Sequence, residues 1–275
     1  MRMKKRKLPY YISVVFLLIY SFVMLYPIIW MFFTSFKTNA DIRKNSISLW
    51  PKEWVLDGYT KAFTQATIGK WFINSMVVTI SVTVVVILTS TLIGFVFAKF
   101  KFKMKRTLFV LLLATMMVPG QVTMIPRYLM IQKMGLFNTK WALIIPGVVS
   151  AFGIYLCRQF IEDIPDSICE AAMIDGETSF GIYRKIILPN LRPVIASLGI
   201  FTAMSVWNDY LNPLLMLNDK DKMTLPLALV VFSTEHTQDL TTTMAVASVI
   251  MVPMIIIFLL FQKQFVNSLV LSGIK

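Results

Sequence analysis

The feature that most constrains this chain is a series of long, almost uninterrupted apolar runs. A helix rises about 1.5 Å per residue, so roughly 20 apolar residues cross the hydrocarbon core of a bilayer. Hydrophobic residues make up 57% of the 275-residue chain, and they come in blocks of that length rather than in one-sided stripes. The sequence therefore predicts an all-α, multi-pass membrane protein with one membrane domain over residues 1–275. Six spans are expected, near 11–33, 72–97, 107–131, 141–161, 194–217 and 243–262.

Lysine and arginine residues indicate the orientation of these spans, because short cytoplasmic loops carry an excess of both. If the N-terminus lies inside, 16 of the 27 basic residues fall in inner segments, with clusters at residues 2–7 and 99–106. We therefore expect both termini in the cytoplasm. The net charge of +13 requires no nucleic acid, since basic loops of this kind contact anionic lipid headgroups.

The inner loop at 162–192 is unusually acidic, since six of the fourteen acidic residues lie between Glu162 and Glu177. Its pattern predicts a short helix after Pro165, because proline suits the first turn of a helix. Gly176 is placed where a left-handed cap would end that helix. Thr178 or Ser179 can cap a second helix that runs through Ile187 and stops at Pro189.

Two interpretations of this loop stay open on local pattern alone. Ala171 and Ala172 would permit close approach of another protein surface, and the neighbouring acids would give that surface charge. Alternatively, the loop is a solvated connector between two spans.

Two polar segments interrupt the predicted spans. Pro119, Gly120 and Gln121 lie near the middle of the third span, where a proline kinks a helix. The kink either faces a polar path or serves packing, and Gln121 favours the path because an amide that faces lipid is costly. Asn208, Asp209 and Tyr210 lie in the outer half of the fifth span. Asp209 faces a polar interior or caps a broken helix.

The sequence contains no recognisable motif for nucleotide binding or catalysis. Gly176 and Gly181 have the spacing of a phosphate-binding loop, but Ile182 and Tyr183 stand where Lys and Ser or Thr are required. With a single histidine, His236, and no clustered carboxylates inside the predicted spans, we expect no catalytic residues, no metal and no cofactor. The chain is not expected to be an enzyme.

The spacing in the inner loop resembles a family signature. Glu170-Ala-Ala-x-x-x-Gly176, followed after nine residues by Ile186-x-Leu188-Pro189, is similar to the loop motif of ABC importer permeases. Further matches resemble their carbohydrate-uptake branch and its MalG-like six-helix subunits. These matches are Phe72-Ile-Asn74-Ser75, Met117-Val-Pro119-Gly120-Gln121, Ile125-Pro126-x-Tyr128, Arg158-Gln-Phe160, Trp207-Asn-Asp-Tyr210-x-x-Pro213-Leu214 and the tail Gln262-Lys-Gln-Phe265-Val266 with Gly273 and Lys275.

The resemblance implies a permease subunit of the bacterial cytoplasmic membrane that imports a sugar or oligosaccharide. It implies a second, related permease, two ATP-binding subunits and an extracytoplasmic solute-binding protein as partners. The residues expected to couple to the ATPase are Glu170, Ala171, Ala172, Asp175, Gly176, Ile186, Leu188 and Pro189. The tail is expected to reach toward the ATPase dimer interface. Gln121, Asn208, Asp209 and Tyr210 are expected to line the solute path.

Two departures from the family pattern concern the docking contacts, because Glu177 stands where a small residue is usual and Asn267-Ser268 where Gly-Leu is common. Other functions stay open at this point. The same machinery could import a non-sugar solute such as glycerol-3-phosphate. An ATP-independent secondary transporter is a second class, which scarce intramembrane charge and the absence of an evident internal repeat disfavour. A membrane scaffold without transport is a third.

Overall fold

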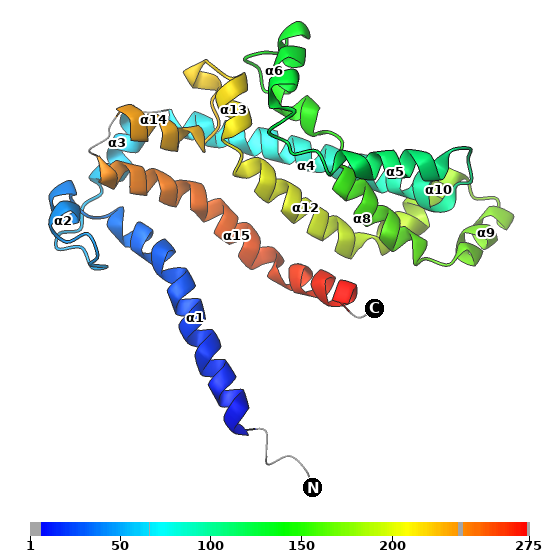
Figure 1. The fold of residues 1–275 in the computed structure, drawn as a ribbon, viewed down its shortest axis with the longest axis horizontal. Coiled ribbons are helices and arrows are strands. Elements are labelled where there is room, and N and C mark those ends of the chain that lie inside the picture. The colour runs from blue at the N-terminus through cyan, green and yellow to red at the C-terminus, as the bar shows by residue number, and fades with distance from the viewer. Residues whose placement is uncertain (1–6, 66, 236–238, 274–275) are drawn as a thin grey trace. The chain divides into compact units, whose positions relative to one another are not determined.

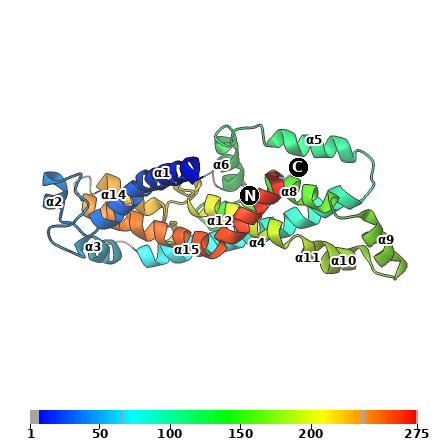
Figure 2. The ribbon, with the colours of Figure 1, turned by 90° about the horizontal axis from the view of Figure 1, so that it is seen from below.

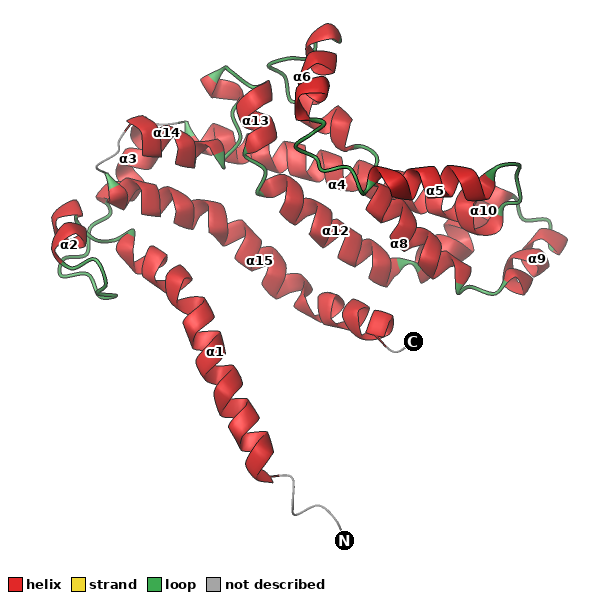
Figure 3. Cartoon of the chain, in the orientation of Figure 1, coloured by secondary structure: helices red, strands yellow, loops and turns green. Residues whose placement is uncertain are grey.

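The computed structural model describes residues 7–65, 67–235 and 239–273, and every regular element within these ranges is helical (Figures 1 and 3). In chain order these are α1 (Lys7–Thr34), α2 (Asn39–Lys44), α3 (Asp57–Gln65), α4 (Ile68–Lys99), α5 (Lys105–Thr115), α6 (Met124–Lys133), α7 (Trp141–Ile144), the 3-10 turn η1 (Ile145–Gly147), α8 (Ala151–Glu162), α9 (Asp166–Ile174), α10 (Ser179–Ile182), the π-helical turn η2 (Tyr183–Ile187), α11 (Leu188–Asn190), α12 (Arg192–Trp207), α13 (Leu211–Met216), the 3-10 turn η3 (Lys220–Lys222), α14 (Leu227–Glu235) and α15 (Leu240–Gly273).

Four segments of the described chain are long and apolar enough to cross a membrane. They are Tyr10–Thr34, Ile68–Lys99, Trp141–Glu162 and Leu240–Leu260, and they coincide with four of the six expected spans. A fifth arises if Ser179–Asn190 and Arg192–Trp207, which meet at 76°, are counted as one broken span. The all-helical membrane fold is confirmed, and two of the expected spans differ in detail.

The expected span at 107–131, with its kink at Pro119, is not a single helix in the structure. α5 ends at Thr115, turns follow, and α6 begins only at Met124. Pro119 lies in the gap. Proline has no N–H to continue the helical ladder and disfavours helical backbone in the residue before it. The proline ends this helix rather than kinking it.

The expected span at 194–217 also breaks. α12 ends at Trp207, and α13 restarts at Leu211. Pro213 explains the restart, because in an unbroken helix its missing N–H would leave the Asp209 carbonyl unpaired. In the first turn of a new helix that N–H has no intrahelical partner in any case.

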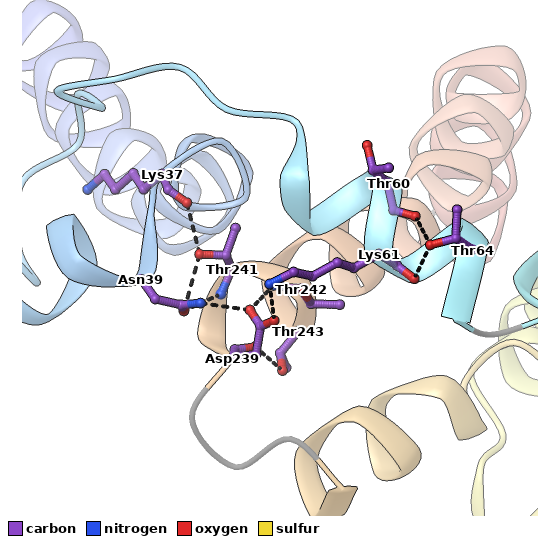
Figure 4. Close-up of polar contacts among 9 residues, drawn as sticks. All are labelled: Lys37, Asn39, Thr60, Lys61, Thr64, Asp239, Thr241, Thr242 and Thr243. Carbon is purple, nitrogen blue, oxygen red and sulfur yellow. Dashed lines mark hydrogen bonds and ion pairs between the residues drawn. The ribbon is translucent and has the colours of Figure 1, made fainter.

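The chain divides into two compact units, residues 1–68 with 228–252 and residues 69–227 with 253–275. The first unit contains α1, whose side chains from Tyr10 to Leu25 are mostly exposed. It also contains a polar cluster around Asp239 (Figure 4). The Asp239 carboxylate accepts hydrogen bonds from Asn39 (2.9 Å) and the Thr242 N–H (3.1 Å), and it pairs with Lys61 (3.0 Å). This cluster ties α2 and α3 to the start of α15.

In the second unit, α4 and α8 run parallel and touch closely. Thr89 donates to the Val148 carbonyl at 2.8 Å. A Cβ on Gly94 would lie 2.8 Å from the Cys157 Cβ, and one on Gly153 would meet the Ser90 hydroxyl. Small residues therefore let the two helices approach as membrane helices commonly do.

Two further helices of this unit, α12 and α5, pack against α4 and α8. α12 runs antiparallel to α4, with Phe72 against Trp207 at one end (ring centroids 5.7 Å apart) and Gly199 near Ile87 further along. α5 is held to α8 by Arg158, whose guanidinium lies 3.8 Å from the Phe109 ring centroid. Figure 2 shows α9, α10 and α11 together at one end of this unit.

Candidate functional site

The first limb of the inner loop is α9 with the cap that ends it. Gly176 has φ = +83°, the left-handed conformation expected of it. Its N–H bonds the Met173 carbonyl at 3.1 Å, and the Glu177 N–H bonds the Ala172 carbonyl at 2.9 Å. These two bonds form a Schellman motif. The predicted left-handed cap is confirmed.

α9 presents most of its side chains outward. Glu170, Ala171 and Asp175 are exposed, and Ile174 is 86% exposed. Cys169 instead faces the protein, and burial raises the pKa of its thiol. The outward surface therefore combines acids, a small residue and a large apolar side chain, a mixture typical of a protein contact.

The second limb begins as predicted, because the Thr178 hydroxyl accepts the Gly181 N–H at 3.1 Å and caps α10. It does not stop at Pro189. The chain passes through the π-helical turn η2, in which Leu188 donates to the Tyr183 carbonyl five residues back, and stays helical to Asn190. This wider turn directly before Pro189 breaks the i→i−4 pattern that a proline would otherwise disrupt.

The loop residues divide by environment. Ala172, Ile186 and Leu188 pack against the main apolar core of the second unit. The loop's other predicted coupling residues, Glu170, Ala171, Asp175, Gly176 and Pro189, are exposed. The signature therefore contains both anchoring positions and surface positions.

Glu177, which departs from the family pattern, forms an ion pair with Lys185 at 2.6 Å. Its side chain crosses directly over Gly181, where a Cβ would collide with the Glu177 carboxylate. The departure therefore ties the two limbs together at the turn.

Lys99 is a residue of this site that sequence reasoning missed. Its side chain is only 9% exposed, and its ammonium binds the Asp166 carboxylate at 2.5 Å and the Ile164 carbonyl. The hydrogen bond and the charge of Lys99 hold the pKa of Asp166 below its usual range. Lys99 lies in the basic segment that the sequence assigned to orientation, so its pairing left no local signal.

The predicted path residues are not joined into one site by direct hydrogen bonds. Gln121 is exposed in the turns between α5 and α6, and Tyr210 is half exposed. Asn208 donates its side-chain amide to the Met204 carbonyl at 2.9 Å. Asp209 accepts the Asn212 N–H at 3.2 Å and its side-chain amide at 2.7 Å, which is the capping arrangement left open by the sequence.

Arg127 is the second missed residue. Its guanidinium contacts the Asn212 side-chain oxygen at 3.4 Å, so Asn212 bridges Arg127 of α6 and Asp209. A basic residue inside the predicted third span was a signal that could have found it.

Some expectations fall outside the described residues. His236 is one, and the side chains of the tail from Gln262 onward are others. Among the described residues, no three His, Cys, Asp or Glu side chains gather where they could hold a metal ion.

Comparison with known proteins decides the family. The model of the "binding-protein-dependent transport system inner membrane component" family matches residues 90–270. The chain belongs to this family. The matched range contains the last turns of α4, the whole inner loop and both polar segments, so this permease carries its loop signature inside the family region.

Relatives support the assignment over nearly the whole chain. The arabinooligosaccharides transport system permease protein AraQ of Halalkalibacterium halodurans is 31% identical over 93% of this chain and 92% of its own. The probable ABC transporter permease protein YurM of Bacillus subtilis is 35% identical over 95% and 87%. A solved bacterial ABC transporter involved in import of the acidic polysaccharide alginate shares the fold, with a TM-score of 0.85, 22% identity and coverage of 96% and 98%. This permease is a membrane-spanning component of an ABC transport system.

Proposed function

We propose that this permease imports a sugar or oligosaccharide, and that it forms the translocation path with a second, related permease. The named relatives support the solute class, since AraQ is named for arabinooligosaccharides and other relatives for diacetylchitobiose and starch degradation products. Two ATP-binding subunits and an extracytoplasmic solute-binding protein complete the system. The chain acts as one permease domain with both termini in the cytoplasm.

The coupling contact is the inner loop. The observation that carries this proposal is the surface of α9, where exposed Glu170, Ala171 and Ile174 stand on a helix that a Schellman cap ends at Gly176. A short rigid helix with an exposed apolar residue and acids fits a groove on a separate protein. ATP hydrolysis takes place on that partner.

Gly176→Val tests the coupling role. Nothing lies within 4 Å of a Cβ at Gly176, so the substitution acts through backbone strain, which costs about 1–2 kcal/mol or more for a β-branched residue in the left-handed region. We expect sugar uptake to be abolished, together with ATPase stimulation or co-purification of the ATPase.

Gly135→Val is the matched control. Gly135 also has a positive φ, +69°, and its Cβ would also meet nothing within 4 Å, but it lies outside the inner loop. We expect the control to assemble and to transport. Normal uptake in Gly176→Val would remove the coupling role from this loop.

The second part of the proposal concerns the path. Gln121, Asn208, Asp209 and Tyr210 supply amide, carboxylate and phenol groups that can bond sugar hydroxyls. Single cysteine substitutions at Gln121 and Asn208 should react with a maleimide more slowly when the solute is present. A binding screen on the partner binding protein identifies that solute, and labelling indifferent to it contradicts the path assignment.

A further inference from the structure

One face of α4 contacts both limbs of the inner loop. Thr91, Phe95 and Lys99 are spaced by four residues, so they lie above one another on the helix. Thr91 is fully buried, Phe95 is 5% exposed, and the Lys99 side chain is 9% exposed. We call these three residues the α4 stripe.

Thr91 and Phe95 of the α4 stripe contact the second limb of the inner loop through Tyr183. The Thr91 and Tyr183 hydroxyls share a buried hydrogen bond of 2.8 Å. The Phe95 and Tyr183 rings lie 5.7 Å apart, and Tyr183 in turn contacts exposed Phe180 at 5.9 Å. The Tyr183 ring therefore connects the exposed Phe180 side chain to Phe95 of α4.

The last residue of the stripe holds the first limb. The Lys99 ammonium binds the Asp166 carboxylate, in the first turn of α9, and the Ile164 carbonyl, in the connection from α8. The chain itself joins α9 to α8, and the Lys99 ion pair joins α9 to α4. The Lys99 side chain is mostly covered, so its ammonium is stabilised by these two partners, whereas the Asp166 side chain stays 77% exposed.

We propose that the α4 stripe transmits movement of the inner loop to α4, with Lys99 as the positioning residue for α9. This inference rests on the proposed coupling function of the loop. It assigns to Lys99 a role in transmission and not in docking, since the Lys99 side chain is mostly covered and its ammonium is held by Asp166 and the Ile164 carbonyl.

A labelling experiment tests the proposal without knowledge of the solute. Gly69→Cys places a thiol in the first turn of α4, at an exposed site where a Cβ meets nothing within 4 Å. The native thiols Cys157 and Cys169 are buried. In the purified complex with its ATPase subunits, the reaction rate with a membrane-impermeant maleimide is measured with and without ATP and vanadate.

In the otherwise unchanged chain, we expect the two rates to differ, because nucleotide shifts the population of α4 positions. In Lys99→Met we expect their ratio to move toward one while the ATPase still co-purifies, because α9 loses its contact with α4 and only the Tyr183 contacts remain. Lys103→Met removes the same charge from an exposed residue of the same basic segment and should respond like the unchanged chain. If Lys99→Met does not accumulate, Asp166→Asn, at a residue whose side chain is 77% exposed, removes the partner charge with the same expected result.

The outcomes separate the two proposals. Loss of ATPase co-purification from the unchanged chain contradicts the coupling function itself. Co-purification with an equal nucleotide response in Lys99→Met, Asp166→Asn and the unchanged chain overturns the transmission role alone, and so does an unchanged chain whose α4 does not respond to nucleotide.

Discussion

The two ends of α4 each hold a loop, and they do so by different chemistry. At its start, Trp71 donates to the Lys220 carbonyl, Asn74 donates to the carbonyls of Asp221 and Met223, and Ser75 accepts the Leu225 N–H. At its other end, the α4 stripe holds the inner loop through an ion pair, a hydroxyl pair and ring contacts.

The two ends of α4 differ in which groups of the loop they bind, backbone or side chain. The start of α4 binds the backbone of residues 220–225 mainly through neutral side chains, and it adds one exposed ion pair, between Lys70 and Asp221 at 3.0 Å. The path of that loop therefore depends chiefly on its backbone. The inner end binds mainly side chain to side chain. Its contacts therefore respond to charge and to single substitutions, as expected of a joint that transmits movement rather than one that only fixes a loop.

The largest expected effect is at the start of α4. Asn74→Leu removes a buried donor and leaves two carbonyls without it, each worth about 1–3 kcal/mol, so we expect a loss of about 3 kcal/mol in stability. Thermal unfolding of the purified complex measures it. The control Ile73→Leu, at the exposed neighbouring position, should change stability by less than about 0.5 kcal/mol. Equal effects of the two variants would mean that the Asn74 hydrogen bonds to the loop backbone do not stabilise the protein.

Two glycines in α4, Gly94 and Gly69, test the close packing of α4 against α8. An alanine at Gly94 would place its Cβ 2.8 Å from Cys157 Cβ and 3.0 Å from the Arg158 backbone nitrogen. We expect Gly94→Ala to destabilise by about 2 kcal/mol through overpacking. Gly69→Ala meets open space and should gain up to about 1 kcal/mol from helix propensity. The same unfolding assay compares them, and a neutral Gly94→Ala would mean that α4 and α8 are not closely packed.

The hydroxyl pair in the stripe should respond asymmetrically. Thr91→Val leaves the buried Tyr183 hydroxyl unpaired, and we expect a cost of about 1–2 kcal/mol. In Tyr183→Phe, Thr91 keeps its bond to the Ile87 carbonyl at 2.8 Å, so the cost should be below about 1 kcal/mol. A double-mutant cycle in the unfolding assay measures the coupling, and additive effects would show that the two hydroxyls do not interact.

The smallest expected effect lies outside α4, at Asp239. It tests whether the polar cluster around this carboxylate stabilises the first unit in a pH-dependent way. Burial opposes ionisation of this carboxyl, but hydrogen bonds from Asn39, Thr242 and Lys61 outweigh it and lower the pKa to about 2. A lowered pKa stabilises the fold above the ordinary value of 3.8, and this contribution is lost as pH falls toward 2. We expect Asp239→Asn to cost about 1 kcal/mol near neutral pH, allowing for its partial exposure.

The difference between this variant and the unchanged chain should shrink as the pH falls from about 5 toward 2. Thermal unfolding at several pH values follows it. A difference that is constant across this range would mean that the Asp239 charge does not stabilise the first unit.

Much of the fold could be predicted because it depends on local pattern. Run length located four spans, and the cap residues Gly176 and Thr178 were recognised from their own φ preference and hydroxyl. The breaks could not be predicted, because Pro119 can kink or end a helix with equal local logic, and tertiary packing decides between the two.

Side-chain contacts between residues far apart in the sequence could not be predicted either. Lys99 and Asp166 are 67 residues apart, and Arg127 and Asn212 are 85 apart. No periodicity or motif connects such positions. Only the parallel packing of α4 with α8 brings the first pair together, and the break after α12 turns Asn212 toward α6.

We propose that the exposed surface of α9 contacts a separate ATPase subunit, and this contact can be measured directly. Ile174 is its most exposed large side chain, so the direct measurement is cross-linking of Ile174→Cys in the assembled, transporting complex with a short thiol-to-amine reagent. We predict a product that contains this permease and the ATPase subunit, and no such product from Asp221→Cys, which lies on the loop at the other end of α4. A transporting Ile174→Cys complex that forms no cross-link to the ATPase would contradict the claim.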